Sequence, residues 1–363
     1  MRIAVCGDIC PTPHTEQLFE SGDTQALFGG ALDVFRGSDR VIVNLECALT
    51  ESDAPIRKIG PNLGSHPATA KTLAKAGVTD CAISNNHILD YGVRGLRDTV
   101  RALEDNGIRW TGAGDDEDAA RRNHLIELEG RKIALIAVCE HEYTYALPDR
   151  AGARAWDPYD TMEDIRAAAG EADHVIVLYH GGKEQCEYPS PRLRKLCRAM
   201  GRAGAGAVLC QHSHCIGCYE RFEGCHILYG QGNFHFIEEE RHPHPHWRSG
   251  LIVQLDIGRE MEIGFIPVVV RGNGIDLARG GERAALLGAF HTRSEMLRDG
   301  QWLDGWRAFC AEHLEQYRDA VANAFSPGST ERQDQRFAHY LDCEAHTDVW
   351  RELFPTWNHV NER

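Results

Sequence analysis

The sequence lacks a long hydrophobic run, and none of its apolar stretches approaches the roughly 20 residues that cross a bilayer. Its first residues, MRIAVCGDIC, predict a short strand and lack the long apolar stretch and small-residue cleavage site of a signal peptide. Basic residues are in deficit, with 39 Lys and Arg against 54 Asp and Glu and a formal net charge of −15. No Lys/Arg stripe is present to bind a phosphate backbone. These absences argue against a membrane span and a nucleic-acid partner, and they favour a cytoplasmic protein.

The 13 cysteines show no framework of regular spacing, and their number is odd. Most lie in apolar surroundings, as Cys6, Cys81 and Cys210 do. This pattern favours reduced thiols over the disulfides of a secreted protein. The C-x-x-C at 215–218 has no second pair to complete a zinc site, so it too is interpreted as two reduced thiols.

Strands and helices alternate through the first two-thirds of the chain. Buried strands are predicted at 2–8, 40–46, 78–84, 132–138, 174–180 and 207–214, and helices at 69–77, 93–107 and 189–204, each helix closed by a glycine. This alternation predicts an α/β layered fold. Two further strands, 250–258 and 261–270, are predicted to form a hairpin, which favours a two-sheet sandwich over a doubly wound nucleotide fold.

The sequence divides into a main domain, 1–275, and a helical C-terminal extension, 276–363. The extension is rich in aromatic residues and is interrupted by FSPGSTER at 325–332. Because it reads as amphipathic helices beyond the strand-rich part, we expect it to pack on the main body or on a second copy in a homo-oligomer.

Polar side chains follow five of the predicted strands, where ligand sites of α/β sheets lie. They are Asp8, Asn44 with Glu46, Asn86 with His87, His180, and His212 with His214. A single histidine at a strand end is more often a structural or surface residue than a ligand, but five coincidences are harder to dismiss. Mixed oxygen and nitrogen ligands suit Mn, Fe or Zn, and their number suffices for one or two divalent ions.

The chain resembles the CapA-type capsule and poly-γ-glutamate biosynthesis family, which is related to the calcineurin-like metallophosphoesterases. The resemblance rests on six motifs in order and with comparable spacing: GD (7–8), NLE (44–46), NNHILDYG (85–92), HGGKE (180–184), HSH (212–214) and GNFHF (232–236). It covers roughly residues 1–270. It implies a calcineurin-like sandwich, with two central mixed sheets flanked by helices and the site at the strand ends.

The resemblance also implies metal-binding roles for six positions. They are Asp8 and His214 for a first ion, Asn86, His180 and His212 for a second, and Glu46 as the bridging carboxylate. The family's superfamily opens with Asp-x-His, but here the motif is Asp8-Ile9-Cys10, and its second motif carries Asp where this chain has Glu46 behind Asn44. Either Cys10 replaces the missing ligand or the first site is weak or empty, so one ion is better supported than two.

The ligand types imply the chemistry of a hydrolase. A metal would lower the pKa of a bound water, producing a hydroxide nucleophile, and would neutralise charge on a phosphoryl or carbonyl oxygen. His87 would protonate the leaving group, and Asp90 would orient the loop that carries it. Lys183 and Glu184, which follow His180, are candidates to contact an anionic substrate, or they pair with each other.

These features predict a metal-dependent hydrolase of a phosphoester or amide bond, acting on an anionic small molecule or polymer. Two alternatives stay open. One is a non-catalytic scaffold of a polymer-synthesis complex that has lost a ligand at Cys10, and the other is a metal-dependent γ-glutamyl amidase. Glu140, His141 and Glu142 follow a further strand and are weaker candidates to line the cleft.

Overall fold

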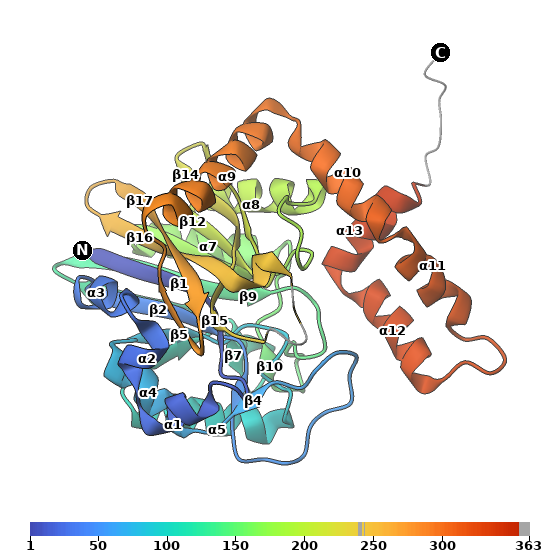
Figure 1. Cartoon of the computed structure of the whole chain (residues 1–363), viewed down its shortest axis with the longest axis horizontal. Coiled ribbons are helices and arrows are strands. Elements are labelled where there is room, and N and C mark those ends of the chain that lie inside the picture. The colour runs from blue at the N-terminus through green and yellow to red at the C-terminus, as the bar shows by residue number, and fades with distance from the viewer. Residues whose placement is uncertain (239–241, 243, 356–363) are drawn as a thin grey trace.

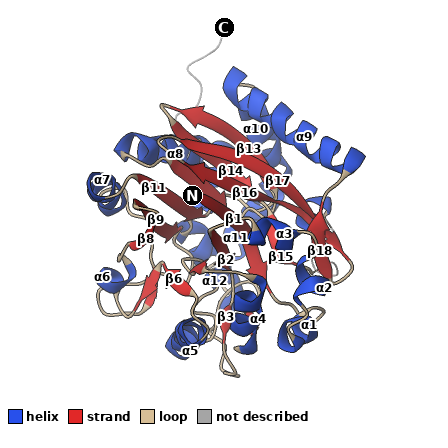
Figure 2. Cartoon of the chain, turned by 90° about the vertical axis from the view of Figure 1, so that its left-hand side faces the viewer, coloured by secondary structure: helices blue, strands red, loops and turns tan. Residues whose placement is uncertain are grey.

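Two mixed β-sheets form the centre of the computed structural model, which describes residues 1–238, 242 and 244–355 (Figures 1 and 2). The first sheet contains β1 (Arg2–Cys10), β2 (Arg40–Leu45), β5 (Asp80–Ala82), β6 (Arg109–Thr111), β15 (Asn233–Phe236), β16 (Ser249–Ile257), β17 (Met261–Arg271) and β18 (Gly274–Leu277). Their order is β18-β17-β16-β1-β2-β5-β6, with β15 paired to β1.

The second sheet has six strands, in the order β13-β14-β12-β11-β9-β8. They are β8 (His124–Leu128), β9 (Arg131–Cys139), β11 (His174–His180), β12 (Ala207–Gln211), β13 (Ile216–Phe222) and β14 (Cys225–Gln231). Two small pairs stand apart: β3 (Ala48–Leu49) with β4 (Gly64–Ser65), and β7 (Ala113–Gly114) with β10 (Gly152–Ala153).

Helices cover the outer faces of both sheets. Those of the first sheet are α1 (Glu16–Ser21), α2 (Thr24–Phe28), α3 (Ala31–Arg36), α4 (Ala68–Ala76) and α5 (Gly92–Asp105); α6 (Glu117–Ala120), α7 (Asp160–Glu171) and α8 (Pro191–Ala203) follow later in the chain. The predicted α/β sandwich of two mixed sheets flanked by helices is confirmed.

The alternation of side chains along the strands produces this layering. On β1, Ile3 and Val5 enter the core between the sheets, whereas Ala4 and Cys6 enter the core beneath the first helices. Strands buried on both faces must be apolar on both, which is why the sequence shows continuous hydrophobic runs there. All 13 cysteines are buried and unpaired, as predicted.

The C-terminal region consists of five helices, as far as the structure describes it. They are α9 (Gly280–Asp299), α10 (Trp302–Glu312), α11 (Leu314–Asn323), α12 (Glu331–Asp342) and α13 (Glu344–Leu353). α9 packs on β13 and β17, and Trp306, Tyr317 and Val349 share a core with α8 (Figure 1). The extension therefore packs on the main body. A separate 1–275 domain and association with a second copy stay predictions.

The FSPGSTER segment interrupts the helices as predicted: residues 325–330 lie between α11 and α12, and 331–332 open α12. A short 3-10 helix (Pro245–Arg248) precedes β16. Among residues 1–238, 242 and 244–355, no helix combines the length and apolarity needed to span a bilayer.

Candidate metal centre

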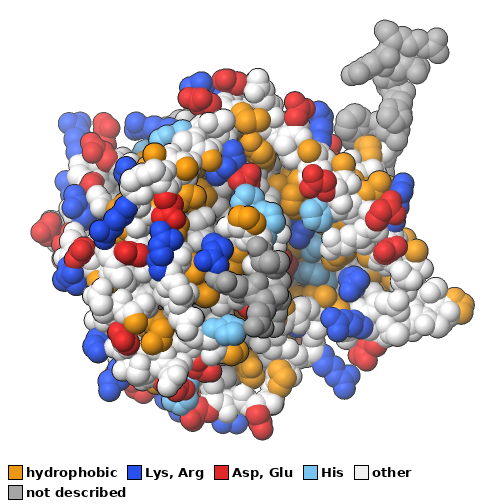
Figure 3. Space-filling model, viewed as in Figure 1, with side chains coloured by type: hydrophobic (Ala, Val, Ile, Leu, Met, Phe, Trp, Pro, Cys, Tyr) orange, Lys and Arg blue, Asp and Glu red, His pale blue; other side chains and the backbone are white. Residues whose placement is uncertain are grey.

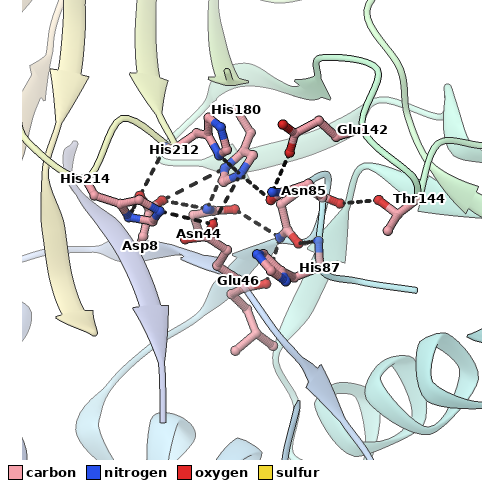
Figure 4. A network of polar contacts seen from close by, with 12 residues as sticks. Asp8, Asn44, Glu46, Asn85, His87, Glu142, Thr144, His180, His212 and His214 are labelled. Carbon is pink, nitrogen blue, oxygen red and sulfur yellow. Dashed lines mark hydrogen bonds and ion pairs between the residues drawn. The ribbon is translucent and has the colours of Figure 1, made fainter. Parts of the chain in front are cut away.

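The carboxyl ends of parallel strands from both sheets meet at one edge of the sandwich (Figure 4). β1 and β2 run parallel in the first sheet, and β9, β11 and β12 run parallel in the second. Asp8 lies near the end of β1, Asn44 and Glu46 at the end of β2, and His180 at the end of β11. The loop after β12 adds His212 and His214. Parallel topology therefore brings together residues that are far apart in the sequence.

A close approach of two backbones explains the GD and GN motifs. A Cβ on Gly7 would lie 2.1 Å from the carbonyl oxygen of Gly232, so only glycine fits there. This approach places β15 beside β1 and pairs Asp8 with Asn233. Asn233 Oδ1 lies 2.9 Å from Nδ1 of His214. Asn233 belongs to the GNFHF motif, in which the sequence predicts no role for it, and its contact with Nδ1 orients the ring of His214.

The histidine pair of the HSH motif has an unusual backbone. His212 has φ +80° and His214 has φ +51°, in the left-handed region that side chains with a Cβ rarely adopt. The His212 N–H donates to Asp8 Oδ2 at 3.1 Å, and the His214 ring packs 4.3 Å from that of Trp247. Such strained positions concentrate at functional sites, where surrounding contacts hold them.

Glu46 is a fully buried carboxylate whose oxygens accept no hydrogen bond from any described residue. Instead, Oε1 lies 3.5 Å from His180 Nε2 and 3.7 Å from His214 Nε2. Burial, and then the negative charge of Asp8, raise the pKa of Glu46 well above its usual value. A buried charge without partners is costly, and a cation at this position would remove that cost.

The surrounding side chains have the chemistry of metal ligands. Ligand atoms of Glu46, His212 and His214 all lie within 4.8 Å of one another. His180 Nε2 lies 3.0 Å from Asn86 Oδ1 and 3.1 Å from His212 Nδ1. Burial lowers the pKa values of His180 and His214, which favours the neutral imidazole that binds metals. The residues fit a divalent cation, although their roles as ligands stay predictions.

His87 is held from one side by a carboxylate and a lysine. Its Nδ1 lies 2.6 Å from Asp90 Oδ2 and 3.0 Å from Lys58 Nζ, and Lys58 also pairs with Asp90 Oδ1 at 2.5 Å. Burial, and then Lys58, lower the pKa of His87, whereas Asp90 opposes that shift. With Nδ1 engaged, Nε2 is the nitrogen left for the cavity that His87 lines. Lys58 lies in a segment without helix or strand, and no sequence motif marks it.

The additional site residues predicted from the sequence lie in different surroundings. Cys10 Sγ donates to the Pro11 carbonyl at 3.4 Å and is not among the clustered ligand atoms around Glu46. Asn44 Nδ2 donates to Asp8 Oδ1 at 2.7 Å, so the amide positions that carboxylate. Lys183 lines the cavity.

Glu184 also lines the cavity. Burial acts to raise its pKa, but Lys183 and nearby histidines outweigh burial and lower it to about 2. Glu184 is therefore a fixed negative charge beside Lys183, and contact of either residue with a substrate stays a prediction.

Of the three residues after β9, only Glu142 lines the cavity. Its Oε2 accepts a hydrogen bond from Asn86 Nδ2 at 2.5 Å. Glu140 accepts a hydrogen bond from the backbone N–H of Ala345 on α13 at 3.2 Å, and His141 pairs with Glu344 at the start of α13. These two residues therefore bind the C-terminal helices rather than face the cavity.

The cavity beside these residues has a volume of about 250 Å³ and lies between the main body and the C-terminal helices. Figure 3 shows histidine side chains gathered in this hollow. From the body it is lined by Lys58, Asn86, His87, Glu142, Lys183, Glu184, His212 and His214, and from α12 and α13 by His339, Tyr340, Ala345 and His346. Sequence reasoning missed the helical lining, because it carries no motif and lies beyond the resemblance.

The fold and the site define an α/β sandwich protein with a buried, histidine-rich candidate cation site at its strand ends. The chain belongs to the bacterial capsule synthesis protein family PGA_cap, whose profile matches residues 2–238. The resemblance to CapA-type proteins is thereby confirmed. Helices α9–α13 lie outside the matched range.

Relatives and a solved structure show the extent of this similarity. The chain is 27% identical over 245 residues to the capsule biosynthesis protein CapA of Bacillus anthracis (65% of this chain, 60% of the relative), and 30% identical over 239 residues to the PGA biosynthesis protein CapA of Bacillus subtilis (63% and 62%). It thus matches about 60% of the length of these relatives. A putative 5′-nucleotidase from Staphylococcus aureus aligns at TM-score 0.46 and 14% identity, covering 80% of this chain and 58% of that one.

Proposed function

We propose that this chain is a metal-dependent hydrolase acting on an anionic substrate in capsule or poly-γ-glutamate metabolism. The observation that carries the proposal is Glu46, a buried carboxylate without hydrogen-bond donors that faces the nitrogens of His180 and His214. A cation explains why that carboxylate is buried there, and the calcineurin-like arrangement of motifs supports hydrolysis as the reaction.

The residues expected to hold the metal come from both sheets. They are Asp8, Glu46 and His214 for one position, and Asn86, His180 and His212 for the other, with Glu46 shared. When bound, a Mn, Fe or Zn ion supplies Lewis acidity and activates water. The chain's own contribution is orientation: Asn44 positions Asp8, and Asn233 fixes which nitrogen of His214 faces Glu46.

His87 is the proposed proton donor to the leaving group. Asp90 accepts from Nδ1 and stabilises the protonated ring, so the proton to be transferred is held at Nε2. Lys58 occupies the other oxygen of Asp90 and so fixes the carboxylate that orients the ring.

The cavity indicates the substrate class. Lys183 supplies a cation beside the proposed metal ligands, and a volume of about 250 Å³ suits a small molecule or a polymer end. The names of the Bacillus relatives refer to capsule and PGA biosynthesis. We therefore propose a phosphoester or a γ-glutamyl amide as the substrate.

The test is hydrolysis by chelated protein reloaded separately with Mn²⁺, Fe²⁺ or Zn²⁺. A phosphate monoester, a phosphate diester and poly-γ-glutamate are assayed side by side, with chromatography of the polymer products. Turnover of one class that requires the metal supports the proposal and separates phosphatase from amidase. Metal-loaded protein that cleaves none of the three contradicts it.

A non-catalytic scaffold is the second candidate, because the superfamily's first-motif histidine is replaced by Cys10, which is not among the clustered ligand atoms around Glu46. Two related Mycobacterium tuberculosis proteins are named probable polyglutamine synthesis accessory proteins. A scaffold would bind a polymer-synthesis partner through the helical extension and lose that association on its deletion. A deleted chain that stays folded and still associates would contradict this role.

A further inference from the structure

A second cluster of ligand-type atoms lies where the main body meets the C-terminal helices. The side chains of Glu142, Cys343 and His346 are buried, and their ligand atoms all lie within 4.8 Å of one another. Glu142 is in the loop after β9, Cys343 joins α12 to α13, and His346 is in the first turn of α13. We propose that these three residues form a Zn²⁺ site, separate from the centre around Glu46.

The ligand set favours zinc over harder cations. One thiolate, one imidazole and one carboxylate give the S, N and O donors that Zn²⁺ accepts at roughly 2.0–2.3 Å in tetrahedral geometry. Ligand atoms around such an ion lie roughly 3.3–3.8 Å apart, so the distances within the cluster would have to shorten by at most about 1.5 Å. Glu142 and His346 both line the cavity, so a fourth position would open toward it.

Hydrogen bonds from outside the cluster orient two of the ligands. The hydroxyl of Tyr317 lies 2.6 Å from Nδ1 of His346, which assigns Nε2 to the metal. Glu142 Oε2 accepts from Asn86 Nδ2 at 2.5 Å, and Oε1 lies 3.5 Å from His339 Nε2. Outer partners of this kind fix imidazole tautomers and carboxylate orientation in metal sites.

The helix junction that carries Cys343 is anchored independently of any metal. Glu344 accepts hydrogen bonds from the His141 backbone at 2.9 Å and from Trp156 Nε1 at 2.8 Å. Asp348 accepts from Ser190 Oγ at 2.5 Å and from Arg192 Nε at 2.8 Å. The cluster is thus held in place by the fold, and a bound ion would link α13 to the body beside Asn86.

Cobalt substitution tests this site directly, because Co²⁺ bound to a thiolate gives a charge-transfer band that imidazole and carboxylate ligands do not. Chelated full-length protein titrated with Co²⁺ should show that band, and Cys343→Ser should abolish it. Cys310→Ser is the matched control, since Cys310 is another buried thiol of the extension, and it should keep the band. Cys10→Ser should keep it too, which separates this site from a thiolate at the main centre.

Zinc affinity supplies a second readout that does not require hydrolysis. His346→Gln removes one ligand, so the Zn²⁺ affinity of one class of site should fall by about 100-fold or more. Metal affinity drops even when only a hydrogen-bond partner of a ligand is removed, and the loss of the ligand itself should cost more. His212→Ala should leave the thiolate band in place while removing metal from the main centre. The proposal is overturned if folded wild-type protein shows no thiolate band, or if the band survives in Cys343→Ser. Because the band is independent of turnover, an inactive protein that shows it would contradict only the hydrolase proposal.

Discussion

The two walls of the cavity differ in how the sequence encodes them. The body wall includes side chains that follow strands of the two sheets, such as Asn86, His87 and His212. The helical wall consists of residues on α12 and α13, including His339 and His346. The family match ends at residue 238, before the second wall begins. The motifs shared with the family therefore lie in the body, whereas the helical wall lies outside the matched range.

Loss of a body ligand should have the largest effect. His212→Ala removes an imidazole from the clustered atoms around Glu46, so the metal of the main centre should be lost and hydrolysis should fall by about 10³-fold or more. Metal analysis and turnover measure the two effects. His226→Gln is a matched control, because His226 is buried on β14 and bonds to Tyr219 and Met261. Unchanged metal content in His212→Ala would place the ion elsewhere.

His87 should separate proton transfer from metal binding. His87→Gln should lower kcat by about 10²–10⁴-fold, the usual contribution of a general acid, while the metal content stays unchanged. The activity lost should be smaller for a substrate whose leaving group needs no proton. Equal losses for good and poor leaving groups would contradict the assignment of His87.

The sequence identified the candidate metal centre because of the sheet topology. Parallel strands end at the same edge, so polar residues after β1, β2, β11 and β12 had to converge. Helix ends were also predictable where one glycine or proline decides them, as at Gly77 after α4 and Pro191 at the start of α8.

The helical wall could not be predicted in the same way. A helix with buried aromatic residues indicates a packed face but not the surface on which it packs, so His339 and His346 had no expected partners. Lys58 lies in a segment without regular structure, and the path of such a segment depends on the finished fold. The role of Asn233 could not be predicted, because it depends on the pairing of β15 with β1. That pairing and the close approach of Gly7 to Gly232 are seen in the structure.

Asp348 tests the contact between the two walls through pH. Burial raises its pKa to about 6, above the unfolded value near 3.9, although Arg192 and Ser190 oppose the shift. Its contribution to folding is therefore fully present below about pH 4 and is lost as the pH rises through about 6, amounting to roughly 2–3 kcal/mol.

Asp348→Asn should remove that part of the pH dependence, while Arg192 keeps its pairing with Glu140. The free energies of unfolding of wild type and variant, measured by denaturant between about pH 4 and pH 7, should converge at the acidic end. Asp319→Asn, at an exposed position on α11, is the control. It should leave the pH dependence of the free energy of unfolding as it is in the wild type. A constant difference between wild type and Asp348→Asn across the range would contradict the shifted pKa.

The smallest expected effect concerns substrate charge. Lys183→Met removes one of the lysines that line the cavity from the body side. The loss of one charge-assisted contact should raise KM for an anionic substrate by about tenfold, with little change in kcat. Lys195→Met, at an exposed position on α8, should leave both constants unchanged. A loss of kcat alone would give Lys183 a role in the reaction itself.

The most direct test of the central claim is the anomalous scattering of crystals grown with Mn²⁺. The account predicts an anomalous peak at coordination distance from Glu46 and from ring nitrogens of the HSH histidines. Any second peak should lie beside Asn86 and His180. A saturated crystal without a peak beside Glu46, or with manganese bound only elsewhere, would contradict it.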